Sequence, residues 1–262
     1  MGVSMLQASP LTGVFGARIT DVDLSQYDAE LVVEFREQLA RHKVLVIENQ
    51  KHLSPEGLLR FAEEFGEAER AAHPNWQDVP GHVGVKDIHT PNYPTGPDVG
   101  DSWHTDGPPR QHTQWYSFLH AIDVPPYGRD TLFADMSAAY QRLSPALQKF
   151  LETLTAMNSW GASNPDAEPV EHPVIMTDPD TGVKSLYVNR LYTSHIVGLK
   201  LEESALLLEY LYRQTQVPEL QLRVNWQPGT LTMWDNEKTQ HYIVRDKAAD
   251  RRMHRVMVCT GR

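Results

Sequence analysis

The 262-residue sequence contains a single cysteine, Cys259, and no long uninterrupted run of apolar residues. One cysteine cannot form an internal disulfide, which agrees with a reducing compartment. A membrane-spanning helix needs about 20 consecutive apolar residues, and no segment approaches that length. Residues 1–10 lack the basic start and apolar stretch of a secretory signal, and Leu6 breaks the myristoylation pattern. We therefore expect a cytoplasmic protein without membrane association.

Positive charge is also scarce: Lys and Arg number 24 against 34 Asp and Glu, which gives a formal net charge of −10. This balance argues against a nucleic-acid partner, because such binding depends mainly on neutralising phosphates. The apolar fraction of 40% and the charged fraction of 22% are ordinary for a globular protein. We expect one domain over residues 1–262 with a small-molecule partner. The sequence leaves the oligomeric state open between a monomer and a homo-oligomer.

Apolar periodicity and turn residues predict helices in the first quarter and in later insertions, with strands elsewhere. The expected helices cover 28–43, 54–66, 144–157 and 201–213. The expected strands cover parts of 10–25, then 44–47, 114–122, 130–135, 222–226, 231–234, 241–244 and 253–258. A hairpin is expected over 174–189, a long loop over 70–100 and a polar lid over 161–171. Many strands with Gly/Pro turns predict an α+β, mainly β fold: a double-stranded β-helix, or jelly roll, with flanking helices.

A candidate metal site begins in the stretch G-D-S-W-H-T-D-G-P-P, where one residue separates His104 from Asp106. In an extended segment these two side chains point to the same face. His241 is the best third ligand, since a jelly roll brings an early and a late strand together. Two His and one carboxylate with open positions suit Fe(II) in non-haem oxygenases. A lone His-x-Asp triplet can arise by chance among 12 His and 34 acidic residues, so its surroundings must support the assignment.

Those surroundings contain a series of ordered motifs: W-H-T-D at 103–106, G-R-D-T-L at 128–132, M-W-D-N at 233–236, T-Q-H-Y at 239–242 and R-R-M-H-R at 251–255. Together with G-A-R-I-T-D-V-D-L at 16–24 and the run at 172–182, they resemble the taurine dioxygenase family, which includes the 2,4-dichlorophenoxyacetate dioxygenases. The resemblance covers nearly the whole chain.

The resemblance implies an oxygenase on the double-stranded β-helix that uses Fe(II), with 2-oxoglutarate and O2 as co-substrates. It implies hydroxylation of a C–H bond in a small anionic substrate, giving succinate and CO2. Sulfonates, aryloxyalkanoates, alkyl sulfates and amino-acid-like compounds are the expected substrate types.

The resemblance also assigns roles to residues. It implies that His104, Asp106 and His241 are the iron ligands. Thr131 matches a threonine that donates a hydrogen bond to the distal carboxylate of 2-oxoglutarate.

An arginine in the run at 251–255 is implied as the main partner of that carboxylate, and both Arg251 and Arg252 are candidates. Arg255 matches the arginine that faces the substrate anion. We favour Arg251, because residues 251 and 255 share one strand face while Arg252 points to the other. Family members often have one more residue in this run, which keeps Arg252 as the alternative.

Two residues of the 70–100 loop are candidate substrate contacts. His73 lies where the family places a histidine that contacts the substrate anion, and Trp76 can form a pocket wall. A surface histidine and a packing aromatic are the competing interpretations. We expect His254 to point away from the site. The other histidines interpreted as structural or exposed are His112, His120, His172 and His195.

Two other classes of protein remain alternatives. A zinc or manganese isomerase or hydrolase of the cupin type shares the barrel but does not need Thr131 or Arg251. A non-catalytic small-molecule-binding jelly roll would not need an intact metal triad. Halogenation is disfavoured, because a halogenase needs a small residue in place of Asp106.

Overall fold

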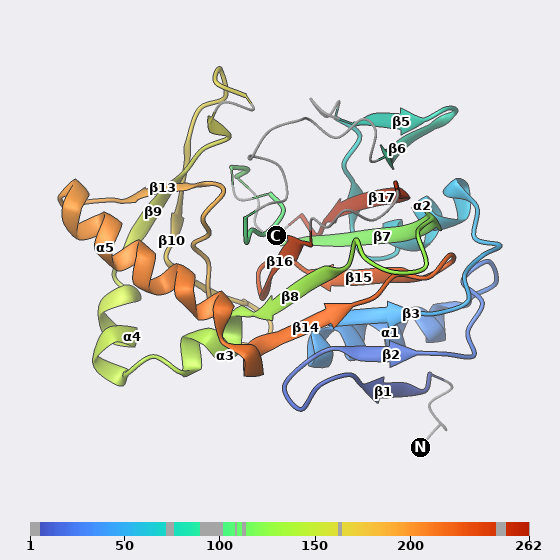
Figure 1. Cartoon of the computed structure of the whole chain (residues 1–262), viewed down its shortest axis with the longest axis horizontal. Helices are drawn as coiled ribbons and strands as arrows, with labels where there is room; N and C mark the ends of the chain where they lie inside the picture. The colour runs from blue at the N-terminus through green and yellow to red at the C-terminus, as the bar shows by residue number, and fades with distance from the viewer. Residues whose placement is uncertain are drawn as a thin grey trace.

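A large twisted sheet forms the main layer of the computed structural model (Figure 1), which describes residues 6–71, 76–89, 102–107, 109–111, 114–161, 164–244 and 250–261. In spatial order its strands are β1 (Ala8–Pro10), β2 (Ala17–Ile19), β3 (Val44–Ile47), β15 (Leu231–Asp235), β7 (Trp115–Asp123), β17 (Arg252–Cys259), β6 (His82–His89) and β5 (Gln77–Val79). The short strand β4 (Glu67–Ala68) also pairs with β17.

A smaller sheet packs on the inner face of the large one. Its strands, in order, are β14 (Gln221–Val224), β8 (Thr131–Asp135) and β16 (Thr239–Ile243). Buried side chains from both sheets form one core: Val46 and Leu119 of the large sheet contact a cluster that includes Phe133 and Val224 of the small sheet. Two mainly antiparallel sheets around one core form the predicted jelly roll, and this prediction is confirmed.

Two helices, α1 (Ala29–His42) and α2 (Pro55–Glu63), cover the outer face of the large sheet. Asp28 and Ser54 begin them as predicted, because their side-chain oxygens accept hydrogen bonds from backbone N–H groups of the first turn. Phe61 packs in the cluster between these helices and the strands. The helices thereby leave the inner face of the sheet free to hold a site.

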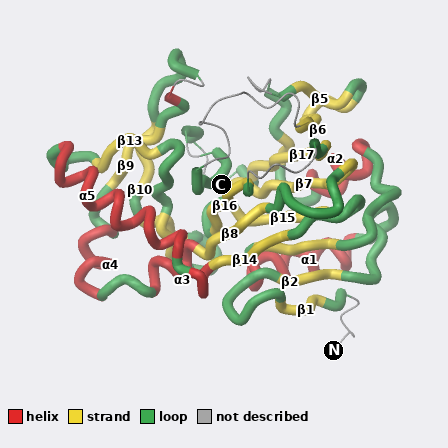
Figure 2. Tube along the Cα trace, viewed as in Figure 1, coloured by secondary structure: helices red, strands yellow, loops and turns green. Residues whose placement is uncertain are grey.

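A second group of elements lies beside the two sheets (Figure 2). Its members are the helices α3 (Met136–Gln141), α4 (Pro145–Leu151) and α5 (Leu201–Tyr212), the 3₁₀ turns Arg213–Gln216 and Pro218–Leu220, and the strands β9 (Thr155–Asn158), β10 (Val170–Pro173), β11 (Ile175–Thr177), β12 (Lys184–Leu186) and β13 (Thr193–Ile196). The predicted hairpin is confirmed, since β11 pairs with β12. Within the described part of the chain, no helix is both long and apolar enough to cross a membrane.

Three sequence-based expectations are wrong in part. The helix predicted over 144–157 ends at Leu151, and residues 155–158 instead form β9 between β10 and β13. The predicted loop 70–100 contains the hairpin β5–β6, and the predicted lid 161–171 contains the start of β10. Strand β9 pairs with β10 and β13, and β6 pairs with β17, so pairing with distant segments overrides the local pattern in these strands. Strand β5 pairs with the adjacent β6.

Candidate active site

The side chains of His104, Asp106 and His241 converge in the interior. Each offers one potential ligand atom, and these atoms all lie within 4.8 Å of one another. An isolated antiparallel bridge joins the backbones of His104 and His241, with N···O distances of 3.1 and 2.7 Å. The sequence predicted an extended strand here, but this single bridge sets the imidazoles side by side, with ring centroids 4.1 Å apart.

Residues behind the triad orient the carboxylate of Asp106. Ser117 Oγ donates to Asp106 Oδ2 at 2.7 Å, and Asn236 Nδ2 donates to Ser117 Oγ at 2.9 Å. Asn236 Oδ1 accepts from the Asp106 backbone N–H at 3.1 Å and from Trp234 Nε1 at 2.9 Å. All four residues are buried. Asp106 is therefore held by a connected network that fixes the direction of its other oxygen, Oδ1.

The protonation states of the triad suit a divalent metal. His104 Nδ1 donates to the Ser102 carbonyl at 2.8 Å, which leaves Nε2 as the ligand atom. Burial lowers the pKa of His104, and it lowers that of His241 to about 3. Burial alone would raise the pKa of Asp106, but the positive charge of Arg255, the two imidazoles and the hydrogen bond from Ser117 together outweigh burial and hold this pKa below its usual range. Neutral imidazoles and an ionised carboxylate are the forms that bind metals.

A cavity opens next to the two imidazoles. It is lined by Trp76, Ile88, His104, Leu119, Thr131, Trp234, His241, Ile243, Arg251 and Arg255. The structure thus brings together the sequence-predicted histidines, the threonine and both favoured arginines. Arg251 is only 2% exposed, and its Nη1 donates to the Arg129 carbonyl at 2.7 Å.

Thr131 is oriented by a neighbour that the sequence did not identify. Its Oγ1 accepts a hydrogen bond of 3.1 Å from Trp226 Nε1, and both side chains are buried. A hydroxyl has one hydrogen and two lone pairs. Because the indole N–H of Trp226 occupies one lone pair of the hydroxyl oxygen, the hydroxyl hydrogen of Thr131 remains available to a ligand in the cavity.

Arg252 lies on the opposite face of β17, as the strand alternation predicts. Its guanidinium donates two hydrogen bonds to Asp87, of 2.9 and 2.8 Å, and does not line the cavity. The pairing of β17 with β7 is irregular between Arg252 and Met253, yet the pairing with β6 continues through this point. The alternation of β17 therefore continues, and Arg251 and Arg255 share the cavity face.

The remaining predicted residues fall in different places. Trp76 is 6% exposed and forms part of the cavity wall. His73 and His112 lie outside the described residues. His120 and His172 are buried and pair through Nε2 with the carbonyls of Gln50 and Arg110, which gives them structural roles.

Sequence reasoning missed Ser117, Asn236 and Trp226. The motif M-W-D-N was recognised, but the role of its asparagine was not. The signal available in the sequence was the amide side chain of Asn236, which lies shortly before the strand of the candidate ligand His241. No comparable signal pointed to Ser117, because serines are common in apolar strands.

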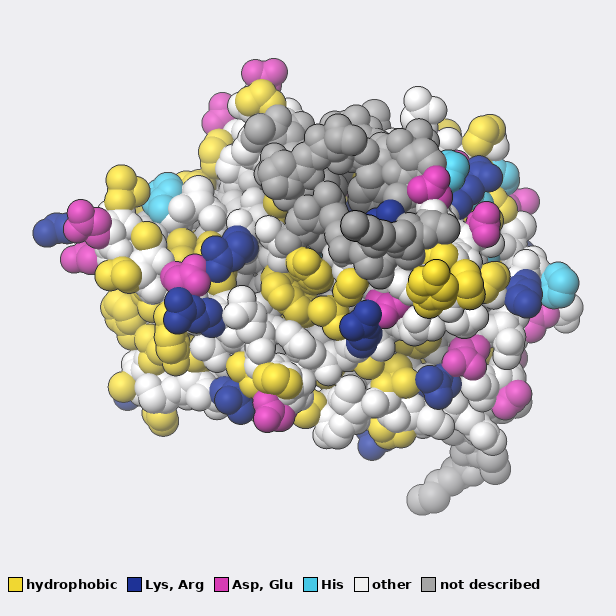
Figure 3. All heavy atoms as spheres, in the orientation of Figure 1, with side chains coloured by type: hydrophobic (Ala, Val, Ile, Leu, Met, Phe, Trp, Pro, Cys, Tyr) yellow, Lys and Arg dark blue, Asp and Glu magenta, His cyan; other side chains and the backbone are white. Residues whose placement is uncertain are grey.

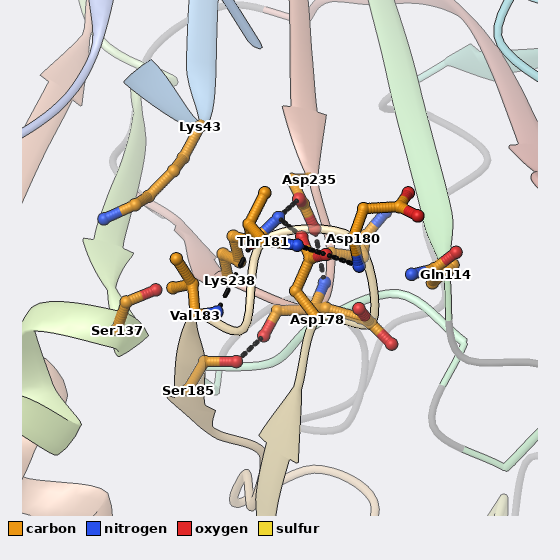
Figure 4. Close-up of polar contacts among 12 residues, drawn as sticks. Lys43, Gln114, Ser137, Asp178, Asp180, Thr181, Val183, Ser185, Asp235 and Lys238 are labelled. Carbon is orange, nitrogen blue, oxygen red and sulfur yellow. Dashed lines mark hydrogen bonds and ion pairs between the residues drawn. The ribbon is translucent and has the colours of Figure 1, made fainter. Parts of the chain in front are cut away.

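A buried ionic cluster anchors the turn that carries Asn236 (Figure 4). The Lys238 ammonium lies between two carboxylates, 2.5 Å from Asp178 and 2.6 Å from Asp235. Asp178 also accepts hydrogen bonds from the backbone of Asp180 and Thr181 in the β11–β12 turn. The cluster therefore joins this hairpin to the β15–β16 turn, on which both Asn236 and His241 depend.

Replacing Lys238 with methionine is expected to destabilise the fold by about 3–5 kcal/mol, because two buried carboxylates lose their shared counter-charge. Urea unfolding followed by circular dichroism measures this free energy. Lys184→Met is the matched control: its side chain is 36% exposed and pairs with Glu152, so its loss should cost less than about 1 kcal/mol. Equal losses in the two variants would contradict the role given to Lys238.

A jelly roll that holds two histidines and an aspartate beside a cavity lined by two arginines defines a class: the mononuclear non-haem metal enzymes. Comparisons with known proteins identify the family within this class. Residues 7–257 match the model described as "Taurine catabolism dioxygenase TauD, TfdA family".

Individual relatives resemble the chain over most of its length. An alkylsulfatase of Acinetobacter baylyi is 32% identical, over 98% of this chain and 85% of the relative. An alpha-ketoglutarate-dependent sulfate ester dioxygenase of Pseudomonas putida is 30% identical, over 98% of this chain and 90% of the relative. The crystal structure of a taurine dioxygenase from Burkholderia xenovorans superposes with a TM-score of 0.86 at 31% sequence identity. The match covers 97% of this chain and 91% of that structure.

The chain therefore belongs to the TauD/TfdA family. It is an Fe(II)- and 2-oxoglutarate-dependent dioxygenase that consumes O2. This confirms the family, the activity class and the cofactors predicted from the motifs. The cupin-type metal enzyme and the non-catalytic binding protein no longer compete with this interpretation.

Proposed function

We propose that this dioxygenase hydroxylates a small organic anion in the cavity lined by Arg251 and Arg255. In this proposal His104, Asp106 and His241 hold the Fe(II). The observation that supports it is the placement of two guanidiniums, one fully buried, around the same cavity as the two imidazoles. Two cations in one cavity suit two anions, the co-substrate and the substrate.

The donor set fits Fe(II). Two neutral imidazoles and one carboxylate offset part of the charge of the ion and leave coordination positions open. The bound metal, with 2-oxoglutarate and O2, supplies the oxidising power that converts a C–H bond into C–OH, with succinate and CO2 as products. The protein contributes the fixed ligand geometry, because Ser117 and Asn236 hold Asp106 in place.

Arg251 and Thr131 suit the distal carboxylate of 2-oxoglutarate. A guanidinium is planar and can give a carboxylate two parallel hydrogen bonds, and a hydroxyl adds a third donor. Both side chains are at most 2% exposed, so water competes little for the carboxylate. Arg252 is engaged with Asp87 on the other face of β17.

Arg255 suits the anionic group of the substrate. Its Nη1 lies 3.4 Å from Asp106 Oδ1, longer than a strong charge-assisted hydrogen bond of about 2.8 Å. Its Nε is buried and has no hydrogen-bond partner among the described residues. The guanidinium therefore retains capacity for an added anion. The alkylsulfatase, the sulfate ester dioxygenase and the taurine dioxygenase are named for sulfate or sulfonate compounds, which supports this substrate class.

Apolar walls complete the proposed substrate site. Trp76, Ile88 and Leu119 line the cavity and exclude water from the carbon to be oxidised. His73 is proposed as a second contact to the anion on the family resemblance alone. Hydroxylation of a carbon attached to a sulfate-ester oxygen gives an unstable product, which releases sulfate and leaves a carbonyl group.

Replacing Arg255 with alanine is expected to raise the KM for the anionic substrate by tens- to about a thousand-fold, because an ionic contact made by a largely buried side chain (15% exposed) is lost. The KM for 2-oxoglutarate should change much less. Steady-state succinate formation measures both constants. Arg252→Ala, whose guanidinium pairs outside the cavity, is the control and should leave both near their original values.

A substrate screen tests the proposed function as a whole. Succinate formation is followed with Fe(II), ascorbate and 2-oxoglutarate in the presence of alkyl sulfates, sulfonates, aryloxyalkanoates or amino-acid derivatives. We expect anions to stimulate turnover and their neutral analogues to fail. Turnover of neutral compounds alone, unaffected by Arg255→Ala, would refute the anionic substrate class.

A further inference from the structure

A second cavity lies between the large sheet and β14, the edge strand of the small sheet, and we call it the edge cavity. Its volume is about 470 Å³, and ligand sites commonly measure about 300–1,000 Å³. Its lining comes from β2, β3, β14 and the segments that follow β3 and β14. Among the described residues, it shares no lining residue with the cavity beside the imidazoles.

Three basic side chains line the edge cavity, on a chain whose formal net charge is −10. Arg18 of β2 pairs at 2.8 Å with Glu48, which also belongs to the lining. Arg223 of β14 pairs with Asp130, which lies outside the lining. Lys51 has no ion pair with any residue that the structure describes. The lining therefore carries three positive charges against one carboxylate.

The rest of the lining suits the body of an organic molecule. Val46 and Val224 are buried and contribute apolar surface, and Asn49 adds an amide. On the face drawn in Figure 3, which includes β14, the basic and acidic side chains of the described residues are interspersed and form no large basic area. Cationic groups gathered around one partly apolar cavity are the arrangement that binds a small organic anion.

The β14 wall of the edge cavity also supports Thr131. The side chains of Arg223 and Asn225 both line the cavity and both donate hydrogen bonds to the Asp130 carboxylate. Asp130 directly precedes Thr131, and Trp226, which follows Asn225, donates to the Thr131 hydroxyl. An anion that binds Arg223 competes with Asp130 for the same guanidinium. The residue next to Thr131 thereby loses one of its two supports.

We propose that the edge cavity is a second ligand site, which binds a small organic carboxylate or phosphate and lowers the affinity of the enzyme for 2-oxoglutarate. The lowered affinity, unlike the binding itself, rests on the assignment of Thr131 to 2-oxoglutarate in the proposed function. Coupling between two sites is commonly about 5- to 150-fold. We expect about fivefold, at the lower end of that range, because Asn225 continues to hold Asp130.

Calorimetric titration of the Fe(II) enzyme, with saturating 2-oxoglutarate under anaerobic conditions, tests the binding. The probes are phenyl phosphate, phenylacetate and the neutral benzyl alcohol. We expect at least one anion to bind and the alcohol to fail, and the two anions distinguish a phosphate site from a carboxylate site. Binding of neither anion, or equal binding of the alcohol, would overturn the proposal.

Variants locate the bound anion. Lys51→Glu should weaken its binding about tenfold or more, because a carboxylate replaces the unpaired ammonium. Lys149→Glu, at an exposed position of α4, makes the same change in net charge and should have little effect. Arg255→Ala removes a cation from the active-site cavity and should leave the edge cavity intact. Binding that survives Lys51→Glu but not Arg255→Ala would place the anion in the active site and contradict the proposal.

Titration of 2-oxoglutarate into the Fe(II) enzyme, with and without the saturating anion, measures the coupling. The anion should weaken 2-oxoglutarate about fivefold in the unmodified protein and leave Lys51→Glu unaffected. An equal effect in Lys51→Glu would mean direct competition in the active site, and no effect in either protein would refute the coupling. Arg251→Ala tests the 2-oxoglutarate site without the anion, so a failure of the proposed function is recognised separately.

Discussion

A His241→Ala variant is expected to lose Fe(II) binding and all 2-oxoglutarate turnover. The proposed iron site has three protein ligands, His104, Asp106 and His241, so the variant retains two. Removing a residue that merely orients a ligand typically weakens metal binding about 10- to 100-fold, and loss of a ligand should cost more. Anaerobic equilibrium dialysis against Fe(II) measures the affinity, and succinate formation measures turnover.

His195→Ala is the control for this experiment. His195 hydrogen-bonds to the neighbouring Ser194 and lies outside the cavity lining. We expect its variant to bind Fe(II) as the unmodified protein does. Retention of normal Fe(II) affinity by His241→Ala would show that the metal is held elsewhere.

An Arg251→Ala variant is expected to bind 2-oxoglutarate tens- to thousands-fold more weakly. Loss of one partner from a buried charge-assisted pair costs on the order of 2–5 kcal/mol, because the other charge remains desolvated without compensation. Arg251 is buried in the cavity wall beside Thr131, where no solvent cation can replace it readily. The measurement is the KM for 2-oxoglutarate, with Fe(II) and substrate saturating.

Two further variants separate charge from geometry. Arg251→Lys keeps the positive charge but cannot give two parallel hydrogen bonds, so it should show an intermediate defect. Arg252→Ala should have little effect on the KM for 2-oxoglutarate. If Arg252→Ala and not Arg251→Ala carries the 2-oxoglutarate defect, then the face assignment of β17 is wrong.

The motifs of the chain were sufficient to predict the family, the jelly roll, and the histidines, the threonine and the two arginines that line the cavity, but not its apolar residues Ile88, Leu119 and Ile243. The choice of Arg251 over Arg252 combined the family match of Arg255 with strand alternation, and the structure places Arg251 and Arg252 on opposite faces accordingly. The face of each arginine could be predicted because it depends only on spacing within one short strand.

Features that depend on distant pairing could not be read in the same way. Residues 155–158 look helical in isolation, yet their hydrogen bonds go to β10 and β13. The bond from Ser117 to Asp106 and the bond from Trp226 to Thr131 join residues that only the folded chain brings together. No local pattern records these partners.

The most direct test of the central claim is the absorption spectrum of the protein with Fe(II) and 2-oxoglutarate under anaerobic conditions. A 2-oxo acid that chelates the iron gives a visible metal-to-ligand charge-transfer band. We predict this band in the unmodified protein and in Arg252→Ala, its absence in His241→Ala, and its appearance in Arg251→Ala only at much higher 2-oxoglutarate. A band of full intensity in His241→Ala would contradict the proposed iron site.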